Sequence, residues 1–399
     1  MIGADIDPRI VEAIGKGVSP HDDETALVER VPRLTASGHL RATLDTAAAV
    51  SEAEAVIVIV PVVVDAARAI DFGPIDAATA DIARGLRRGA LVVYETTLPV
   101  GTTRGRLGPM LERGSGLAAD TDFDLAFSPE RVLVGRVLLD LRRYPKIVGG
   151  TTAAATERGV AFYHAVLDEG TEVRAVANAE TAEMTKLAET TYRDVNIALA
   201  NEYARYAASR GIDVLEVIAA ANSQPYSHVH EPGVGVGGHC IPVYPHFLFH
   251  DEPDLRLPRV AREINDGMGR WAVDLLRHRL GDLAGAAVLV LGIAYRADVR
   301  EDAFSAAFAL RDELARAGAT VFGHDPYFSD DHLREFGFTP FDLGAPVTVR
   351  AAIVQAPHAA YRNLALADLP GLELLVDGRN ALDRDAVEAA GVIYLGIGH

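Results

Sequence analysis

The sequence predicts an α/β protein with two Rossmann-like doubly wound domains joined by a helical domain that has a long central helix. Apolar runs of strand length recur in the first and last thirds of the chain, at residues 55–60, 91–94 and 286–295. The longest helical pattern spans residues 178–210, contains no glycine or proline and stops at Gly211. A chain of 399 residues is long enough for two or three domains.

We expect an N-terminal Rossmann-like domain over residues 1–165, a central helical domain over 166–275 and a C-terminal Rossmann-like domain over 276–399. Residues 55–60 read as a strand buried on both faces, because all six are apolar. Within the long helix, one face is expected to pack in the core because its members recur at spacings of three and four residues. These members are Met184, Leu187, Thr191 and Val195.

Composition narrows the possible partners and compartments. The formal net charge of −18 argues against a nucleic-acid partner. The single cysteine excludes an internal disulfide and suits a reducing compartment, and no apolar run approaches the length of a membrane span. The first residues, MIGADIDPR, do not have the pattern of a signal peptide. We therefore expect a cytoplasmic protein with no membrane partner.

The stretch 231–247, EPGVGVGGHCIPVYPHF, concentrates the chemistry of the chain around its single cysteine, Cys240. Three of its glycines match the dinucleotide fingerprint, but no strand precedes them and no helix opens after them, so that reading is rejected. A cysteine that follows Gly-Gly-His at the end of such a loop indicates a nucleophile beside a bound substrate. The alternatives are a small buried hydrophobe, or a metal site with the neighbouring histidines, whose spacing fits no standard zinc motif.

This stretch resembles the catalytic-cysteine segment of the nucleotide-sugar 6-dehydrogenases, the UDP-glucose / UDP-N-acetylmannosamine dehydrogenase family. Further segments resemble motifs of the same family along nearly the whole chain. They are E-T-T-L-P-V-G-T at 95–102, S-P-E-R at 128–131, A-E-M-T-K-L at 182–187, A-R-E-I-N-D at 261–266 and D-G-R at 377–379. Residues 192–201 resemble the N-acetylhexosamine branch more than the UDP-glucose branch.

The resemblance implies four catalytic residues. Cys240 forms the covalent bond to the substrate, Lys186 stabilises the oxyanion, and Glu130 orients or deprotonates the attacking water. Thr97 lies at the reacting centre. The alternative for this threonine is that it only caps the N-terminus of a helix. No metal is implied.

For the UDP-sugar substrate, the resemblance implies a larger set of contacts. They are Arg131, Lys186, Thr190, Gly233, Gly235, Gly237, Arg262, Arg296 and Arg379. Thr190 stands where the UDP-glucose enzymes have asparagine, and the arginines at 296 and 379 have a surface role as their alternative. The family also has aspartate and arginine at the positions of Tyr244 and Ala303, so the chain is expected to be a divergent member.

The cofactor implied by the resemblance is NAD, with Asp5, Arg9, Pro61 and Thr97 as its contacts. Asp5 ends a short apolar strand, where an acidic residue binds the adenosine ribose. The alternative for this segment is that Asp7 and Pro8 only cap a helix. The first strand and glycine-rich turn of a Rossmann unit would precede Asp5 by about 20 residues. We expect a natural start upstream, or else a remnant that has lost cofactor binding.

Together these features predict an NAD-dependent 6-dehydrogenase that oxidises the C6 hydroxymethyl of a UDP-sugar to the uronate in two hydride transfers through a cysteine thiohemiacetal and thioester. The expected substrate is a UDP-N-acetylhexosamine such as UDP-N-acetylmannosamine, and the expected assembly is a homodimer through the central helix. The alternatives are UDP-glucose as substrate, a non-catalytic nucleotide-sugar-binding protein, or a one-step 2-hydroxyacid dehydrogenase that does not depend on Cys240.

Overall fold

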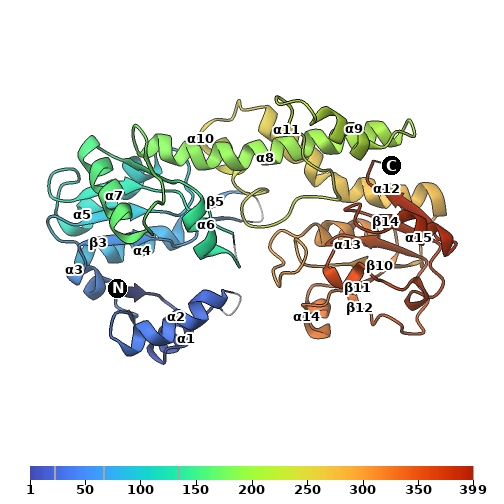
Figure 1. The fold of residues 1–399 in the computed structure, drawn as a ribbon, viewed down its shortest axis with the longest axis horizontal. Coiled ribbons are helices and arrows are strands. Elements are labelled where there is room, and N and C mark those ends of the chain that lie inside the picture. The colour runs from blue at the N-terminus through green and yellow to red at the C-terminus, as the bar shows by residue number, and fades with distance from the viewer. Residues whose placement is uncertain (22–23, 66–67, 134, 399) are drawn as a thin grey trace. The chain divides into compact units, whose positions relative to one another are not determined.

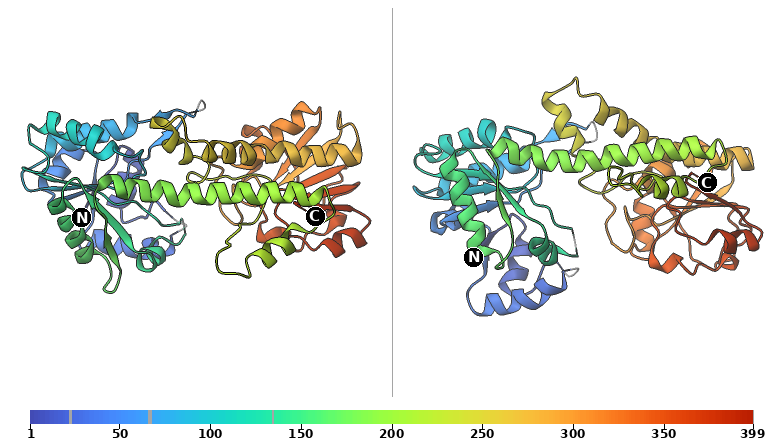
Figure 2. Two further views of the ribbon diagram at one scale, coloured as in Figure 1. Left: turned by 90° about the horizontal axis from the view of Figure 1, so that it is seen from above. Right: turned by 45° about the horizontal axis from the view of Figure 1, so that its top comes forward.

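The computed structural model describes residues 1–21, 24–65, 68–133 and 135–398, and it divides into two compact units (Figure 1). Unit 1 comprises Met1–Glu189 and His246–Pro253, and unit 2 comprises Thr190–Pro245 and Asp254–His399. The boundary falls within helix α8, Ala179–Ala208, which is uninterrupted in every view (Figure 2). Each unit contains a sheet flanked by helices, so the predicted α/β class is confirmed. The three-domain boundaries stay a prediction.

The main sheet of unit 1 has five strands in the order β3-β6-β7-β8-β9. Their bounds are β3 Ala55–Val58, β6 Leu91–Tyr94, β7 Asp124–Phe127, β8 Lys146–Gly150 and β9 Val173–Ala175. Neighbouring strands are parallel except β7 and β8, which run antiparallel. The helices of the unit are α1 Pro8–Gly15, α2 Thr25–Ala36, α3 Thr46–Glu52, α4 Gly73–Gly85, the π-helical η1 Thr103–Leu107, α5 Gly108–Ser115, α6 Val137–Arg143, α7 Ala153–Val166 and α10 Pro245–Asp251.

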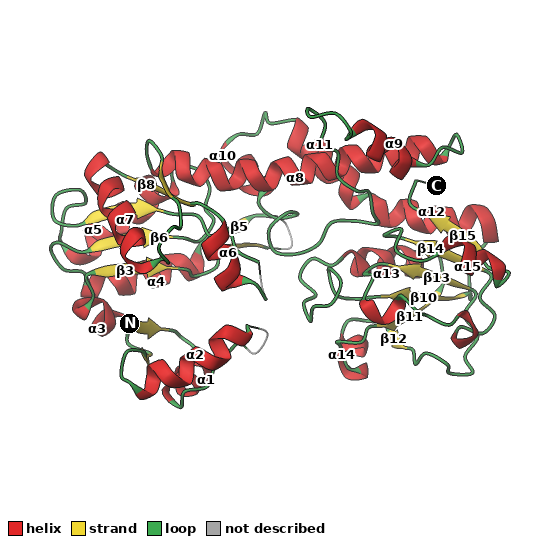
Figure 3. Ribbon diagram, viewed as in Figure 1, coloured by secondary structure: helices red, strands yellow, loops and turns green. Residues whose placement is uncertain are grey.

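The first strand of the chain does not join this sheet. Strand β1, Ile2–Ala4, pairs in parallel with β2, Arg41–Thr43, as a sheet of its own, which Figure 3 draws apart from the main sheet. A second small sheet pairs β4, Val63–Val64, with β5, Ile70–Asp71. Among the described residues, the main sheet therefore begins at β3.

The prediction that residues 55–60 are fully buried is wrong for this reason. Strand β3 pairs with β6 on one side, and no described strand pairs with its other side. Ile57 consequently remains 36% exposed and Ile59, just beyond the strand, 72% exposed. Side chains of a parallel sheet are buried by the helices that cover its faces, and a strand at an unpaired edge is covered less completely.

Unit 2 contains a six-stranded parallel sheet in the order β12-β11-β10-β13-β14-β15. In the unit's own strand numbering this is the doubly wound order 3-2-1-4-5-6. The strands are β10 Ala287–Leu291, β11 Thr320–His324, β12 Thr339–Pro340, β13 Ala351–Val354, β14 Leu374–Asp377 and β15 Ile393–Gly396. The helical segments are α9 Val214–Ala221, α11 Leu257–Asp266, α12 Met268–Leu280, α13 Ala306–Arg316, α14 Asp330–Glu335, η2 Ala359–Tyr361, η3 Leu366–Asp368 and α15 Arg384–Ala389.

Alternate residues of β10 enter two different apolar cores. Val288 and Val290 pack with residues of α8, α12 and α13, whereas Leu289 and Leu291 pack with residues of the opposite face. This alternation is the period-two geometry of a strand covered on both faces.

Helix α8 confirms the predicted helix, and Gly211 follows its end with a φ of +65°. Its predicted apolar face is partly wrong, because Met184 is 43% exposed. Leu187 and Thr191 are buried as predicted, but the buried side of α8 also includes polar residues among its alanines. Its polar members are Glu183, Lys186, Thr190, Thr191, Asp194 and Asn201. Buried polar groups need partners, so this face determines much of the site described next.

Candidate active site

Strand direction brings one lysine to the carboxyl edge of the main sheet in unit 1. β6 and β7 are parallel, so the residues that follow them, Glu95 and the segment 128–131, leave the sheet at the same edge. β8 runs antiparallel to β7, with Phe127 opposite Gly149, so β8 begins at that edge. Continued along the chain, this register sets Lys146 opposite Glu130.

Lys146 bridges two carboxylates. Its Nζ lies 3.1 Å from Glu95 Oε1 and 3.1 Å from Glu130 Oε2. The side chains of Lys146 and Glu95 are 6% and 9% exposed, whereas that of Glu130 is 34% exposed. The Tyr163 hydroxyl of α7 donates to Glu95 Oε1. Glu130 is therefore the carboxylate of this cluster that solvent can reach.

The environment separates the two carboxyl groups. Burial raises the pKa of Glu95 above its usual value and outweighs the attraction of Lys146. Burial acts in the same direction on Glu130, but the Lys146 ammonium and the Arg131 N–H together hold the pKa of Glu130 below its usual value. Such a separation is characteristic of carboxyl pairs in which only one member acts as a base.

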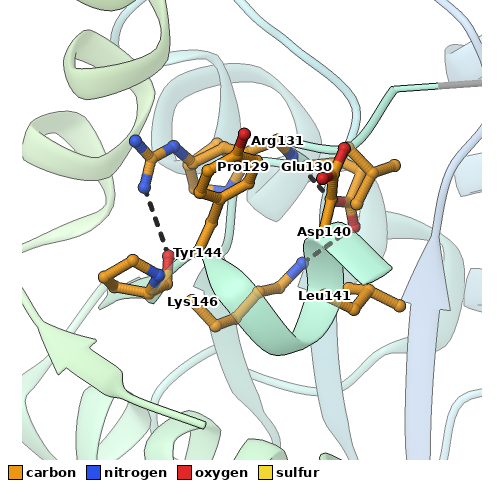
Figure 4. Close-up of a pocket in the computed structure, with 9 residues that line it drawn as sticks. Pro129, Glu130, Arg131, Asp140, Leu141, Tyr144 and Lys146 are labelled. Carbon is orange, nitrogen blue, oxygen red and sulfur yellow. Dashed lines mark hydrogen bonds and ion pairs between the residues drawn. The ribbon is translucent and has the colours of Figure 1, made fainter. Parts of the chain in front are cut away.

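Helix α8 and the segment after Glu130 fix the position of this cluster (Figure 4). Lys186 Nζ donates to the backbone carbonyl of Glu130 at 2.6 Å. Arg131 donates through Nε to Glu189 at 2.9 Å and through Nη1 to the Pro145 carbonyl at 3.2 Å. Figure 4 shows the Lys146 side chain directed toward Glu130, with Arg131 on the other side of the pocket's polar groups drawn as sticks.

Glu183 of α8 anchors the loop that follows Thr97. Thr97 is buried beyond the end of β6. Four residues later, the Gly101 N–H donates to Glu183 Oε2 at 2.5 Å, and the Thr103 N–H and hydroxyl donate to Oε1 at 2.8 and 2.6 Å. Burial nevertheless raises the pKa of Glu183 to about 7. Glu183 and Lys186 thus fix the two loops that carry Thr97 and Glu130.

In unit 2, the glycines before Cys240 are required by close contacts with the protein itself. A Cβ at Gly233 would lie 2.4 Å from Arg379 Nη1, and one at Gly235 would lie 2.8 Å from Ala306 Cβ. A Cβ at Gly237 would lie 2.8 Å from Tyr295 Cβ. These glycines therefore let the loop pack against α13 and against loops of the C-terminal sheet. Their predicted contact with substrate stays a prediction.

Arg379 holds this loop from the carboxyl edge of the C-terminal sheet. Its Nη2 donates to the Gly235 carbonyl at 3.0 Å and its Nε to the Gln355 carbonyl at 2.8 Å. Burial lowers the pKa of Arg379 to about 10, which still leaves the guanidinium charged at neutral pH. By contrast, Arg296 is exposed and donates to the Tyr295 hydroxyl at 3.0 Å.

Arg262 lies in a buried network rather than at an open surface. It is 4% exposed and pairs with Asp194 at 2.5 Å, and it also pairs with Asp266. Asn265 donates to Asp194 Oδ1 at 2.8 Å, and Asn201 donates to Asn265 Oδ1 at 2.8 Å. Asn201 in turn accepts the Gly233 N–H at 2.9 Å, so the network reaches the glycine loop. Thr190 is also buried on α8.

Cys240 is half-buried, and its carbonyl accepts the Val243 and Tyr244 N–H groups at 3.2 and 2.9 Å. It therefore begins a helical turn that leads into α10. The adjacent His239 is exposed, with its Nε2 3.6 Å from Glu301 Oε1. Across the described part of the chain, no group of three or more His, Cys, Asp or Glu residues is arranged to hold a metal ion.

The described residues suit the ribose end of a dinucleotide but provide no pyrophosphate turn. Asp5 directly follows β1 and is exposed, as a ribose-binding carboxylate should be. Asp7 caps α1 with Pro8 in its first turn, and Arg9 pairs with Asp7, so the capping role is confirmed, whereas ribose binding by Asp5 stays a prediction. Pro61 is exposed beyond β3. β1 leads into Asp5-Ile6-Asp7 rather than a glycine-rich turn.

Family models match most of the chain. The NAD binding, central and UDP binding domains of the UDP-glucose/GDP-mannose dehydrogenase family match residues 1–167, 180–267 and 289–384. The UDP-N-acetyl-D-mannosamine dehydrogenase of Pyrococcus horikoshii is 32% identical over 100% of this chain and 93% of its own. That of Salmonella typhi is 37% identical over 79% of this chain and 77% of its own. The chain belongs to the UDP-glucose/GDP-mannose dehydrogenase family.

Solved structures of this family share the fold. The structure of the Pyrococcus horikoshii UDP-D-ManNAc dehydrogenase has a TM-score of 0.90 and 31% identity, covering 100% of this chain and 93% of the other. An NDP-N-acetyl-D-galactosaminuronic acid dehydrogenase from Methanosarcina mazei has a TM-score of 0.87 and 31% identity, covering 100% and 89%. The predicted family, NAD cofactor and class of UDP-sugar dehydrogenase are confirmed. None of the helices in the described part of the chain combines the length and the apolar character of a membrane-spanning segment.

Several residues of this family member's site were not singled out from the sequence. Glu95, Lys146 and Glu183 are buried charges that contact Glu130 or the loop after Thr97. A lysine at the start of the apolar run 146–150 was a usable signal, because lysine is rarely buried without a partner. Its partners depended on the direction of β8, which the sequence did not indicate.

Titration of Glu183 should make the stability of the enzyme depend on pH. Its folded-state pKa of about 7 lies above the ordinary 4.5, so the folded chain binds this proton more tightly than the unfolded chain. The resulting stabilisation is fully present below pH 4.5 and is lost as pH rises through 7, on the order of 3 kcal/mol in total. Urea unfolding of Glu183→Gln at pH 5 and pH 8 should show a correspondingly smaller difference between the two pH values than wild type.

The matched control for this measurement is Glu202→Gln, a substitution at an exposed position of the same helix. It should leave the pH dependence of unfolding as in wild type. Equal pH dependence in wild type and Glu183→Gln would show that Glu183 does not titrate in this range.

Proposed function

We propose that the enzyme oxidises C6 of UDP-N-acetyl-D-mannosamine to the carboxylate, with Cys240 as nucleophile, Glu130 as base and Lys186 as oxyanion donor. The observation that carries the proposal is the hydrogen bond from Lys186 Nζ to the Glu130 carbonyl, which joins an ammonium and a solvent-accessible carboxylate in one cluster. Relatives named UDP-N-acetyl-D-mannosamine dehydrogenase, similar over 79% to 100% of this chain, support the choice of sugar.

NAD supplies the hydride acceptor for both oxidations, and Asp5, Arg9, Pro61 and Thr97 are the residues proposed to contact it. The chain's own residues handle the carbon, the protons and the water. Loss of the first hydride from C6, with the hydroxyl proton passing to water, gives the C6 aldehyde. The Cys240 thiolate adds to this aldehyde, and Lys186 donates to the oxygen that becomes negative. Loss of the second hydride from C6 leaves a thioester on Cys240.

Hydrolysis completes the reaction. Water attacks the thioester carbon, its proton passes to Glu130, and the carbon–sulfur bond breaks to restore the thiolate. Thr97, buried at the same sheet edge, is proposed to hold the hydrogen-bonded water. Arg131, Thr190, the loop glycines, Arg262, Arg296 and Arg379 are the residues proposed to bind the UDP-sugar. Among them Arg296 is exposed and well suited to a diphosphate, whereas Arg262 contributes through the network that holds the Gly233 N–H.

The substitution Cys240→Ser tests the covalent role. We expect wild type to show a transient mass increase of one sugar nucleotide on the protein and Cys240→Ser to show none. Uronate formation should fall by roughly three orders of magnitude or more, because serine is a far weaker nucleophile near neutral pH. The measurements are intact-protein mass spectrometry after rapid quenching and chromatography of the sugar product.

Calorimetric titration of Cys240→Ser with the UDP-sugar is the control, and binding should remain within a few-fold of wild type. Wild-type turnover that survives Cys240→Ser would contradict the thiol mechanism. Binding of the UDP-sugar without any oxidation by wild type would instead favour the non-catalytic alternative.

We further propose that the enzyme is a cytoplasmic homodimer that pairs through α8. The exposed side of this helix carries large apolar residues at spacings of seven, four and three positions. They are Tyr192 at 53%, Leu199 at 41%, Tyr203 at 44% and Tyr206 at 59% exposure. A continuous apolar stripe of this kind on a helix is typical of a helix–helix interface. The single cysteine suits the reducing cytoplasm.

Leu199→Glu should convert the dimer to a monomer, because it introduces a charge at the centre of this stripe. Light scattering coupled to size-exclusion chromatography measures the mass directly. Val166→Glu, at the exposed end of α7, is the matched control and should remain dimeric. A dimer that persists in Leu199→Glu at micromolar concentration would exclude this face as the interface.

A further inference from the structure

The cluster of Glu95, Lys146 and Glu130 buries more charge than the fold requires. Two carboxylates and one ammonium lie within 3.1 Å contacts, and only Glu130 is appreciably exposed. Buried ion pairs contribute little net stability compared with apolar residues of similar volume. A buried cluster with unequal carboxyl environments is more readily explained by a role in the reaction.

We propose that Lys146 is a positioning residue that keeps Glu130 ionised for hydrolysis of the acyl-enzyme. The inference rests on the proposed function, in which Glu130 accepts the proton of the attacking water. It assigns a role to a residue that does not touch the reacting atoms.

Several contacts fix the geometry of this arrangement. Lys146 lies in strand β8, and its Nζ is 5.0 Å from the centre of the Tyr163 ring. The hydroxyl of Tyr163 fixes Glu95. The Arg131 N–H donates to Glu130 Oε1 at 2.6 Å, so Oε2 is the oxygen that faces Lys146. The ammonium thus has one defined position between two fixed carboxylates.

The other charged groups around the cluster are already paired or add positive charge. The Arg131 guanidinium is paired with Glu189. Asp140, which lines the pocket in Figure 4 together with Glu130 and Lys146, is paired with Arg136 at 2.7 Å. Lys186 adds an ammonium at the Glu130 carbonyl. Tyr163 is neutral, because burial and the nearby Glu95 raise its pKa far above the usual value.

This arrangement matches the needs of the hydrolytic step. The water oxygen bonds to the thioester carbon, one water proton goes to Glu130, and the electron pair of the breaking carbon–sulfur bond stays on Cys240. Only an ionised Glu130 can take that proton. A positive charge within 4 to 6 Å of a carboxyl group lowers its pKa by about one to three units. The Lys146 ammonium supplies this charge to Glu130.

Two substitutions on either side of the ammonium test the inference. We define the acid limb as the low-pH side of the pH profile of the hydrolysis rate. In Lys146→Met, this limb should move up by about one pH unit or more. Acyl-enzyme should then accumulate at pH values where wild type shows little. Glu95→Gln retains the ammonium and removes a negative neighbour, so its acid limb should stay in place or move down. Lys146→Arg should restore the wild-type limb. Hydrolysis is followed as loss of the mass adduct after a single turnover.

Folding of each variant is checked by urea unfolding, and Arg142→Met, which removes an exposed partner of Asp168, should behave as wild type in every assay.

A merely structural role predicts slower hydrolysis at all pH values with the acid limb unmoved. That result in Lys146→Met, or an upward shift in Glu95→Gln, would overturn the inference. If Lys146→Met does not fold, Glu95→Gln alone decides the test. An upward shift of its acid limb overturns the inference, and an acid limb that stays in place or moves down supports the inference. Absence of any acyl-enzyme in wild type would instead refute the proposed function itself.

Discussion

The polar face of helix α8 is the constraint on which the rest of the structure depends. Glu183, Lys186, Asp194 and Asn201 are all buried on one side of this helix, where each would cost free energy if left without a partner. Each has a partner in a different loop or helix. The requirement to satisfy these groups therefore fixes the loops that carry the chemistry, first in unit 1 and again in unit 2.

Within unit 1, a second constraint is the reversed direction of β8. A sheet with every strand parallel would start β8 at the opposite edge, away from Glu95 and Glu130. The antiparallel pairing with β7 sets Lys146 between them and allows one ammonium to serve both carboxylates. The enzyme thereby obtains a carboxylate that is ionised, solvent-accessible and held by α8 through Lys186. These are the properties that a base for thioester hydrolysis needs.

Much of the fold could be predicted because strands and helices have local periodicity. Strand β6 matches the apolar run at 91–94, and α8 ends at Ala208, shortly before the predicted stop at Gly211. Apolar spacing predicts a buried Met184, whereas the buried side of α8 is built from alanines, Leu187 and polar residues. The burial of β3 was overestimated because a run of apolar residues does not reveal how many neighbouring strands exist.

Motif resemblance indicated Glu130, Lys186 and Cys240, but not what surrounds them. The contacts of Lys146 depend on strand direction, and those of Asp194 depend on the pairing of α8 with α11. Such contacts join residues far apart in the chain and carry no local signal. The glycines before Cys240 show the same limit, since their close contacts are with Arg379, Ala306 and Tyr295.

The most direct test of the central claim is the stoichiometry of a single turnover. Enzyme in excess over UDP-N-acetyl-D-mannosamine, with saturating NAD in water enriched in oxygen-18, should form two NADH per sugar and a uronate that carries one labelled oxygen. One NADH per sugar with a carbonyl product, or a carboxylate without label, would contradict oxidation through a thioester that water hydrolyses.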